Sequence, residues 1–348
     1  RFHTAGSELI LIGHPGHPEV EGTRGRVDCD VHVLSTVEEV EALEVADPDK
    51  LAYVTQTTLS VDETRDTINA LKERFPAIVG PDVKDVKVGD QRVVYPWIGC
   101  GECPTCKRDE EQLCNKPRQL GIQVAGGYAT HVMVPDAKYL LDYTGVKEGL
   151  AATYMCSGLT AYSAMKKLGD ISPEERVMVV GLGGVGMMGL QFAKAMFDNA
   201  PLGADVDDQK LQAAMGAGAH QTYNPKDADA IKKVLADTNG GVPAAVDFVG
   251  SEASLKFASS IVRKGGKVIV VGLFGGGFAM PIPMFPMRAI SIGGAYVGSL
   301  GETHEMMALV KAGKIDPIPV EERPLDQASK SLDDLREGKI MGRVVLKP

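Results

Sequence analysis

The fold of this chain is decided by the stretch VMVVGLGGVGMMGLQFAKAM, residues 177–196. Its first four residues are apolar and three of them are valine, which predicts a buried β-strand. The pattern Gly181-x-Gly183-x-x-Gly186 follows, and apolar side chains then recur at helical spacing. Such glycines permit a tight turn, let a pyrophosphate approach the backbone, and bring the helix close to the strand. We therefore predict a dinucleotide-binding turn, with a glycine-rich turn in an unrelated α/β unit as the alternative.

Further strands extend this unit into a sheet. An apolar run ends at Asp205, nineteen residues after Gly186, where an acid that binds the adenosine ribose is expected. The segments VDFVG (246–250) and KVIVVGLFGG (267–276) are also predicted strands that end in glycine. This alternation of strands and helices is typical of a doubly wound parallel sheet of the Rossmann type, an α/β fold.

The carboxyl ends of such strands are expected to form a cofactor cleft. The predicted lining consists of Gly181, Gly183, Gly184, Val185, Gly186, Asp205, Val249, Gly250, Val271, Gly272 and Leu273. For each glycine that follows a strand, an ordinary strand-to-loop turn is the alternative. The carboxylate of Asp205 would repel a phosphate on the ribose, so we predict NAD rather than NADP.

Composition limits the classes of function. The chain has 348 residues, enough for about two domains, and a net charge of −9, which argues against a nucleic-acid-binding surface. No apolar run approaches the roughly 18–20 residues of a membrane helix, and the first residues lack a signal-peptide core. We therefore expect a cytoplasmic protein with no membrane or nucleic-acid partner.

Four of the six cysteines are clustered as Cys100-x2-Cys103-x2-Cys106-x7-Cys114. Four thiolates at this spacing suit tetrahedral zinc, and a site whose four positions all belong to the protein is structural. The neighbouring glycines and proline supply the sharp turns of such a lobe. An iron–sulfur cluster, free buried thiols or a disulfide are the alternatives.

Several segments in the same order resemble the zinc-dependent medium-chain alcohol dehydrogenases, over about residues 80–348. They are GDQRVVYPWIGCGECPTC (89–106), GGYATHVMVP (126–135), AATYMCSGLTAY (151–162) and GLGGVG (181–186). The resemblance implies a GroES-like β-rich catalytic domain formed by residues 82–150 and 290–348, and an NAD-binding Rossmann domain at residues 151–289. It also implies an alcohol or aldehyde substrate and a homodimer or homotetramer.

The same resemblance suggests roles for four further residues. Cys156 would be a ligand of a catalytic zinc, and Thr160 would lie near the nicotinamide. Lys210 would flank the adenosine, and Arg343 would lie near the cofactor phosphates. From the residues alone, Cys156 could equally be a small core residue. Lys210 could be a solvated helix lysine, and Arg343 a surface arginine on an edge strand.

The first 80 residues do not fit this family. Strands at 8–13, 31–34 and 51–55 and helices at 36–43 and 60–74 predict a small parallel α/β unit. The segments LIGHPGHPEVEGT (11–23), YVTQTTLSVDET (53–64) and RFPAIVGP (74–81) resemble part of hydroxymethylbutenyl diphosphate reductase. That resemblance would place His17, Glu19 and Thr57 at the substrate of that enzyme. Its cluster-binding cysteines have no counterpart here, so we interpret His14, His17 and Glu19 as ordinary loop residues.

Two ligands of the catalytic zinc in the dehydrogenase family come from the N-terminal region, in motifs that are absent before residue 80. Cys29-x-x-His32 lies at about the position in the chain where the first of these motifs is expected, but it fits the reductase-like segment better. A fusion at the shared VGP of residues 79–81, a wrong sequence over residues 1–81, or a barrel fold of that segment would each explain the conflict. We predict an NAD- and zinc-dependent alcohol dehydrogenase. The alternatives are an inactive NAD-binding fusion without a complete catalytic zinc site, and a diphosphate reductase.

Overall fold

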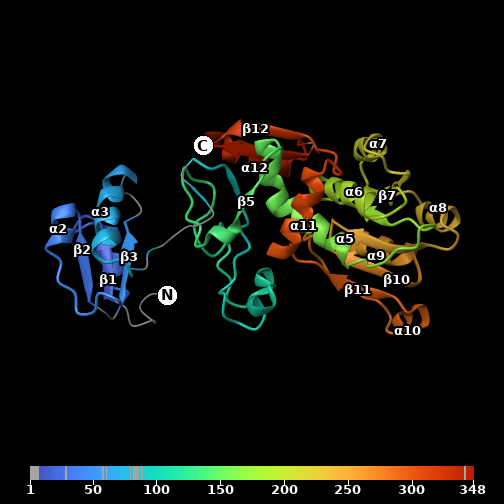
Figure 1. The fold of residues 1–348 in the computed structure, drawn as a ribbon. Coiled ribbons are helices and arrows are strands. Elements are labelled where there is room, and N and C mark those ends of the chain that lie inside the picture. Colours follow the sequence, from blue (N-terminus) through green and yellow to red (C-terminus); the bar gives the residue numbers. More distant parts are fainter. Residues whose placement is uncertain are drawn as a thin grey trace. The chain divides into compact units, whose positions relative to one another are not determined.

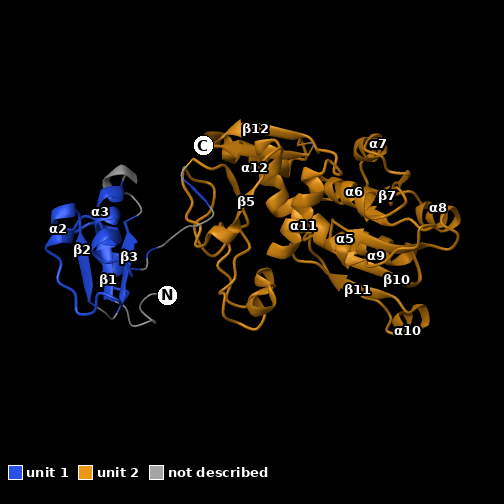
Figure 2. Ribbon diagram, viewed as in Figure 1, with its two compact units in different colours: residues 1–87 blue, residues 88–348 orange. Residues whose placement is uncertain are grey.

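The computed structural model describes residues 8–27, 30–56, 59, 61–78, 80, 86–87, 89–340 and 342–348. The chain divides into two compact units, Arg1–Lys87 and Val88–Pro348 (Figure 2). Each has its own hydrophobic core, and each is described by itself below. Cys29 and Thr57, two residues singled out in the sequence, lie outside the described residues.

Unit 1 is a three-stranded parallel sheet in the order β2-β1-β3. The strands are β1 (Glu8–Ile12), β2 (Val31–Leu34) and β3 (Leu51–Thr55), and the helices are α1 (Pro18–Arg24), α2 (Val37–Glu41) and α3 (Val61–Arg74). The fully buried side chains of Ile10, Leu51 and Leu71 belong to one core between the sheet and helices. The predicted α/β unit is present, and a barrel fold for this segment is therefore wrong.

Helix α1 was absent from the sequence-based prediction, and the interpretation of Glu19 as a loop residue is therefore wrong, because Glu19 lies in the first turn of α1. It is short, and it begins with Pro18. Proline is tolerated there because the first amides of a helix have no carbonyl acceptor within the helix, so the missing N–H removes no hydrogen bond. The side chain of His17 caps it, because Nδ1 accepts a hydrogen bond from the Glu19 amide at 3.3 Å. A proline directly after a polar residue was thus the signal for this helix.

Unit 2 is built on a six-stranded parallel sheet in the order β11-β10-β9-β6-β7-β8 (Figure 1). Its strands are β6 (Met178–Val180), β7 (Leu202–Ala204), β8 (Gln221–Tyr223), β9 (Val242–Asp247), β10 (Val262–Val270) and β11 (Ser291–Gly294). The helices associated with it are α5 (Leu159–Lys166), α6 (Gly184–Met196), α7 (Asp208–Gly216), α8 (Ala230–Asp237), α9 (Glu252–Ile261), α10 (Met284–Arg288) and α11 (Leu300–Lys311). The strand order reverses between β6 and β9, where sheets of this kind bind ligands. This confirms the predicted Rossmann sheet.

Both faces of this sheet are buried. Along β6, Val179 packs in one hydrophobic cluster, whereas Met178 and Val180 pack in the other. A strand covered on both sides is apolar throughout, which explains the continuous apolar run that predicted it. Strands β9 and β10 end before the glycines that were assigned to them. The amides of Val271 and Gly272 both donate to the Asp247 carbonyl, so the regular ladder stops there.

The rest of unit 2 contains two small sheets. Strand β4 (Arg92–Val94) is antiparallel to β5 (Leu140–Asp142), and β12 (Val320–Pro324) is parallel to β13 (Arg343–Lys347). Helix α4 (Glu148–Thr153) continues into a π-helical turn (Tyr154–Gly158) and then α5, and α12 (Ala328–Arg336) lies between β12 and β13 in sequence. Across the described residues, every helix is too short or too polar to span a bilayer.

Candidate functional site

The four clustered cysteines converge in space. Their Sγ atoms all lie within 4.8 Å of one another. The Cys103–Cys106, Cys103–Cys114 and Cys100–Cys106 pairs are 3.5, 3.8 and 3.9 Å apart. Tetrahedral zinc with bonds of about 2.3 Å places its sulfur ligands about 3.8 Å apart. The donor set and its spacing therefore fit a closed structural zinc site.

Backbone amides surround these sulfur atoms. The amides of Cys100 and Lys116 each donate to Cys114 Sγ at 3.3 Å, and the Cys106 amide donates to Cys103 Sγ at 3.5 Å. That last bond is the main reason why the pKa of the Cys103 thiol is lowered to about 6. Burial raises the pKa of Cys106 to about 12. Amides that point at a sulfur favour the thiolate, the form that binds metal.

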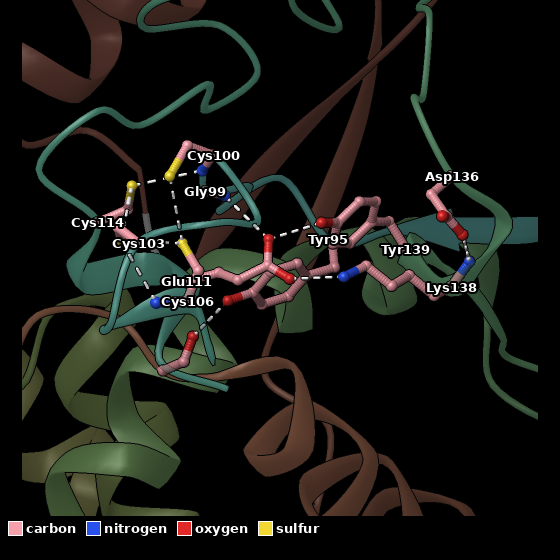
Figure 3. A network of polar contacts seen from close by, with 11 residues as sticks. Tyr95, Gly99, Cys100, Cys103, Cys106, Glu111, Cys114, Asp136, Lys138 and Tyr139 are labelled. Atoms are coloured by element: carbon pink, nitrogen blue, oxygen red, sulfur yellow. Dashed lines mark hydrogen bonds and ion pairs between the residues drawn. The ribbon is translucent and has the colours of Figure 1, made fainter. Parts of the chain in front are cut away.

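Glu111 links the cysteine lobe to neighbouring residues through hydrogen bonds, a role that the sequence did not reveal. Its carboxylate is buried and accepts hydrogen bonds from the Gly99 amide at 3.0 Å, Lys138 Nζ at 2.7 Å and the Tyr139 hydroxyl at 2.6 Å (Figure 3). Burial acts to raise the pKa of Glu111, but these hydrogen bonds outweigh it, and the net shift is downward. An ionised Glu111 thus joins the lobe to the chain segment that leads into β5.

The glycine turn after β6 has the geometry expected of a nucleotide site. Gly181 has φ +86°, and a Cβ on Gly186 would lie 1.7 Å from the Gly181 carbonyl oxygen. A Cβ on Gly183 would meet no atom within 4 Å, so its backbone faces open space. Asp205, just after β7, stabilises the turn, because its Oδ2 accepts a hydrogen bond from the Leu182 amide at 2.7 Å.

A cleft of about 530 Å³ opens at the carboxyl ends of β6 and β7. Gly181, Asp205 and Val249 line it, as predicted. The lining also includes residues that the sequence analysis missed: Val180, Ala204, Val206, Pro225, Lys226, Ile231, Ser251, Ala253, Ser254, Lys256, Phe257 and Phe274. Pro225 and Lys226 follow β8, the strand beside β7. The same strand-end rule could therefore have found them once the sheet order was known.

Other predicted cofactor residues do not line this cleft. They are Gly183, Gly184, Val185, Gly186, Lys210, Gly250, Val271, Gly272, Leu273 and Arg343. The Lys210 amide donates to Asp207 Oδ1 at the start of α7, and Leu273 is exposed. Gly250 has φ +70°, and a Cβ there would lie 1.9 Å from the Gly272 carbonyl oxygen. These two glycines are required by the close contact of their loops.

Cys156 lies in the π-helical turn, and its side chain is open to solvent. The Thr160 hydroxyl donates to the Cys156 carbonyl oxygen at 2.7 Å, and Arg343 Nε donates to Ser157 Oγ at 3.2 Å. Although the Cys156 side chain is accessible to solvent, neighbouring protein atoms partly desolvate its thiol and raise the pKa. The positive charge of Arg343 partly offsets this rise. Arg343 also lies against Gly184 at the start of α6, since a Cβ there would come within 3.0 Å of its Nε.

A catalytic zinc does not fit the part of the chain that the structure describes. Within those residues, Cys156 belongs to no group of three side chains able to hold a metal, whereas the four-cysteine cluster does form such a group. His32 lies on β2 of unit 1, with Nε2 3.0 Å from Glu8 Oε2. The roles predicted for Cys156 and Thr160 stay predictions.

Family models match three parts of the chain. A zinc-binding dehydrogenase model matches residues 184–312, and an alcohol dehydrogenase GroES-like domain model matches residues 77–144. A LytB protein model matches residues 1–86, so residues 77–86 lie in two matches. The GroES-like match confirms the predicted β-rich domain.

Individual relatives agree with these models. The NAD-dependent alcohol dehydrogenase of Sulfolobus acidocaldarius is 35% identical over 274 residues, 77% of this chain and 78% of that protein. An alcohol dehydrogenase of Geobacillus stearothermophilus is 37% identical over 276 residues, 77% of this chain and 79% of that protein. The crystal structure of the alcohol dehydrogenase of Aeropyrum pernix superposes with a TM-score of 0.71 at 29% identity, covering 78% and 79% of the two chains. The chain therefore belongs to the zinc-dependent medium-chain alcohol dehydrogenase family.

Proposed function

We propose that this chain binds NAD and transfers hydride between it and a small alcohol or aldehyde. The observation that carries the proposal is the cleft at the switch point of the parallel sheet, which Gly181 of the open glycine turn and the adjacent Asp205 line together. Residues 151–294 would form the NAD-binding domain, because β11 pairs with β10 in its sheet, and the boundary at residue 289 predicted from the sequence is therefore too early. Residues 82–150 and 295–348 would form the catalytic domain. Relatives of this chain are NAD-dependent alcohol dehydrogenases, which supports the same reaction class.

Each part of the turn has a proposed task. The open backbone at Gly183 and the N-terminus of α6 would receive the pyrophosphate, with Arg343 beside Gly184 as a nearby positive charge. Asp205 Oδ1 and Oδ2 accept amide hydrogen bonds, but a carboxylate has lone pairs left to accept from ribose hydroxyls. A negative charge at that position favours NAD over NADP.

Bound NAD would supply the hydride acceptor when an alcohol is oxidised to an aldehyde or ketone with release of one proton. The chain's contribution is to orient the nicotinamide toward the face that carries Thr160 and Cys156. Cys100, Cys103, Cys106 and Cys114 would hold one structural zinc, which fixes the lobe without taking part in the reaction.

A second candidate is an NAD-binding module that does not turn over alcohol. It is favoured by the solitary position of Cys156, which lacks companion metal ligands among the described residues. Zinc per chain and NADH formation from a series of primary and secondary alcohols separate the two. NADH formation from any of these alcohols supports the enzyme. One zinc ion with NAD binding and no NADH supports the module, and absence of NAD binding contradicts both.

We further propose that the chain self-associates as a homodimer or homotetramer. Strand β11 lies at the edge of the six-stranded sheet, and the exposed apolar side chains of Ile282, Phe285 and Met287 precede it in sequence. An open edge strand with nearby apolar residues favours pairing with another chain. Light scattering after size-exclusion chromatography tests this. A cytoplasmic location is proposed as well, supported by cysteines grouped for metal rather than for disulfides.

A further inference from the structure

The side chain of Arg343, the first residue of β13, lies beside the start of α6. A Cβ on Gly184 would come within 3.0 Å of Arg343 Nε and within 2.6 Å of the Gly342 carbonyl oxygen. The strand therefore reaches the helix only because residue 184 has no side chain. Gly183, which caps α6, offers no side-chain acceptor to the first amides of the helix. The positive end of the helix and the guanidinium thus lie next to each other.

Arg343 has a positive charge that is not balanced within the described part of the chain, where no carboxylate pairs with it. Neighbouring protein atoms desolvate the guanidinium and lower its pKa, and the thiol of Cys156 is the titratable group that opposes this effect. Desolvation of a charge without a counter-ion costs free energy. An anionic ligand that reached this guanidinium would therefore be bound more favourably than at a solvated or ion-paired arginine.

Ser157 holds this guanidinium by one nitrogen. It lies in the π-helical turn Tyr154–Gly158, where its side chain is 3% exposed, and its Oγ donates a hydrogen bond to the Thr153 carbonyl oxygen at 2.9 Å. A hydroxyl has a single hydrogen, so Ser157 Oγ can meet Arg343 only as an acceptor. Arg343 Nε donates to it at 3.2 Å. The helix thus fixes the hydroxyl, and the hydroxyl fixes the direction of the Nε–H bond.

The contact at Nε leaves the rest of the guanidinium available. This group is planar and carries five N–H donors in a rigid arrangement. With Nε bound to Ser157, the four donors on Nη1 and Nη2 remain, and these two nitrogens can contact two oxygens of a phosphate at once. Because the group is planar, a fixed Nε–H bond also restricts where Nη1 and Nη2 can lie.

We propose that Ser157 is a positioning residue for the cofactor, which holds Arg343 at Nε so that Nη1 and Nη2 are ordered for a pyrophosphate at the start of α6. The inference rests on the proposed function, because it takes NAD as the ligand. An arginine side chain that is already ordered loses less conformational entropy when the ligand binds. The turn that carries Cys156 thus has a second task, which does not depend on a metal.

The test is a double-mutant cycle on the full chain, with NAD affinity measured by calorimetric titration. Ser157→Ala should weaken NAD binding by about three- to tenfold, and Arg343→Gln should weaken it by about tenfold or more. The double variant should bind NAD no more weakly than Arg343→Gln alone, because Ser157 then has no guanidinium to hold. The same fold-loss from Ser157→Ala in both backgrounds overturns the proposal, because Ser157 would then act independently of Arg343.

Ser259→Ala is the matched control for the loss of a buried hydroxyl. Ser259 is 2% exposed on α9, and its Oγ donates to the Leu255 carbonyl oxygen four residues earlier, as Ser157 does to Thr153. It does not belong to the lining of the cleft. Its replacement should leave NAD affinity within about twofold of the unmodified chain. Equal losses from the two alanine variants would trace the effect to the missing hydroxyl alone and overturn the proposal.

Two fragments of the cofactor separate positioning from a general distortion of the site. ADP-ribose contains the pyrophosphate, whereas adenosine does not. Ser157→Ala should weaken ADP-ribose as much as NAD and leave adenosine affinity unchanged, and an equal loss for adenosine overturns the proposal. NAD binding that Ser157→Ala leaves intact overturns this inference alone. An unmodified chain that binds neither NAD nor ADP-ribose contradicts the proposed function, and the role of Ser157 is then overturned with it.

Discussion

At the nucleotide turn, Gly181 has φ +86°, a backbone conformation in which an L side chain is strained. Gly186 has a different reason to be glycine, because its missing side chain is what lets α6 approach the Gly181 carbonyl. Gly183 has neither constraint, and open space lies on its Cβ side. Three glycines that look alike in the sequence thus separate into two with a structural role and one that leaves room for a ligand.

This difference predicts opposite behaviour for two alanine variants. Gly186→Ala should destabilise the protein by about 1–3 kcal/mol, because the new methyl group collides with fixed backbone. Gly183→Ala should leave stability near that of the unmodified chain but weaken NAD binding, because the methyl group fills the space proposed for the pyrophosphate. Urea unfolding followed by circular dichroism and calorimetric titration with NAD measure the two effects. A stable Gly186→Ala variant, or a Gly183→Ala variant with full NAD affinity, would contradict this account.

Glu111 gives a second prediction for a single residue. Replacement by alanine leaves the buried Tyr139 hydroxyl without its acceptor, which costs about 1–3 kcal/mol of unfolding free energy. The cysteine lobe should also release zinc to a chelator faster, as followed with a colorimetric zinc indicator. Glu110→Ala is the control, because that neighbouring side chain forms only a surface ion pair with Arg108 among the contacts described. Equal zinc release from both variants would show that Glu111 does not support the lobe.

Among the elements, those buried on both sides were the most predictable from sequence. Strand β6 was found because both of its faces are covered, so the chain is apolar without interruption there. Helix α1 was missed because its seven residues carry one buried side chain, Val20, too few for a periodic pattern. The lining contributed by Pro225 and Lys226 was missed for another reason. It depends on which strand lies beside β7, and strand order is set by tertiary packing rather than by local sequence.

The cysteine lobe offers a test for an element held by metal. Removal of zinc with a chelator should increase hydrogen exchange across residues 99–116, because the 3-10 turns there, η2 (Cys106–Arg108) and η3 (Glu111–Leu113), are too short to be stable alone. Exchange at residues 202–206 beside the cleft should stay unchanged, since that strand belongs to the core of the large sheet. Unchanged exchange in the lobe after complete zinc loss would exclude a structural role for the metal.

For the whole molecule, the sequence predicts two unlike parts with a junction near residue 80. The family matches at residues 1–86 and 77–144 overlap in that region, and the chain divides into its two compact units between residues 87 and 88. The ligands of a catalytic zinc could not be found from the sequence. The described structure explains why, because Cys156 has no companions there that could complete such a site.

Two separate cores predict two unfolding transitions in differential scanning calorimetry. Saturation with NAD at about 100 times its Kd should raise the midpoint of unit 2 by about 5–10 °C, because ligand binding stabilises the unit that contains the cleft. The transition of unit 1 should stay in place. A single transition that shifts as a whole with NAD would show that the two units unfold together.

The self-contained core of unit 1 has a consequence for how such a gene can arise. Its three strands pair with one another, and its helices cover them without help from the dehydrogenase part as described. A crossover between two ancestral genes at the overlap near residue 80 would therefore place a segment with its own closed core ahead of the dehydrogenase part. Unit 1 could then fold as it leaves the ribosome, before synthesis of the dehydrogenase part is complete.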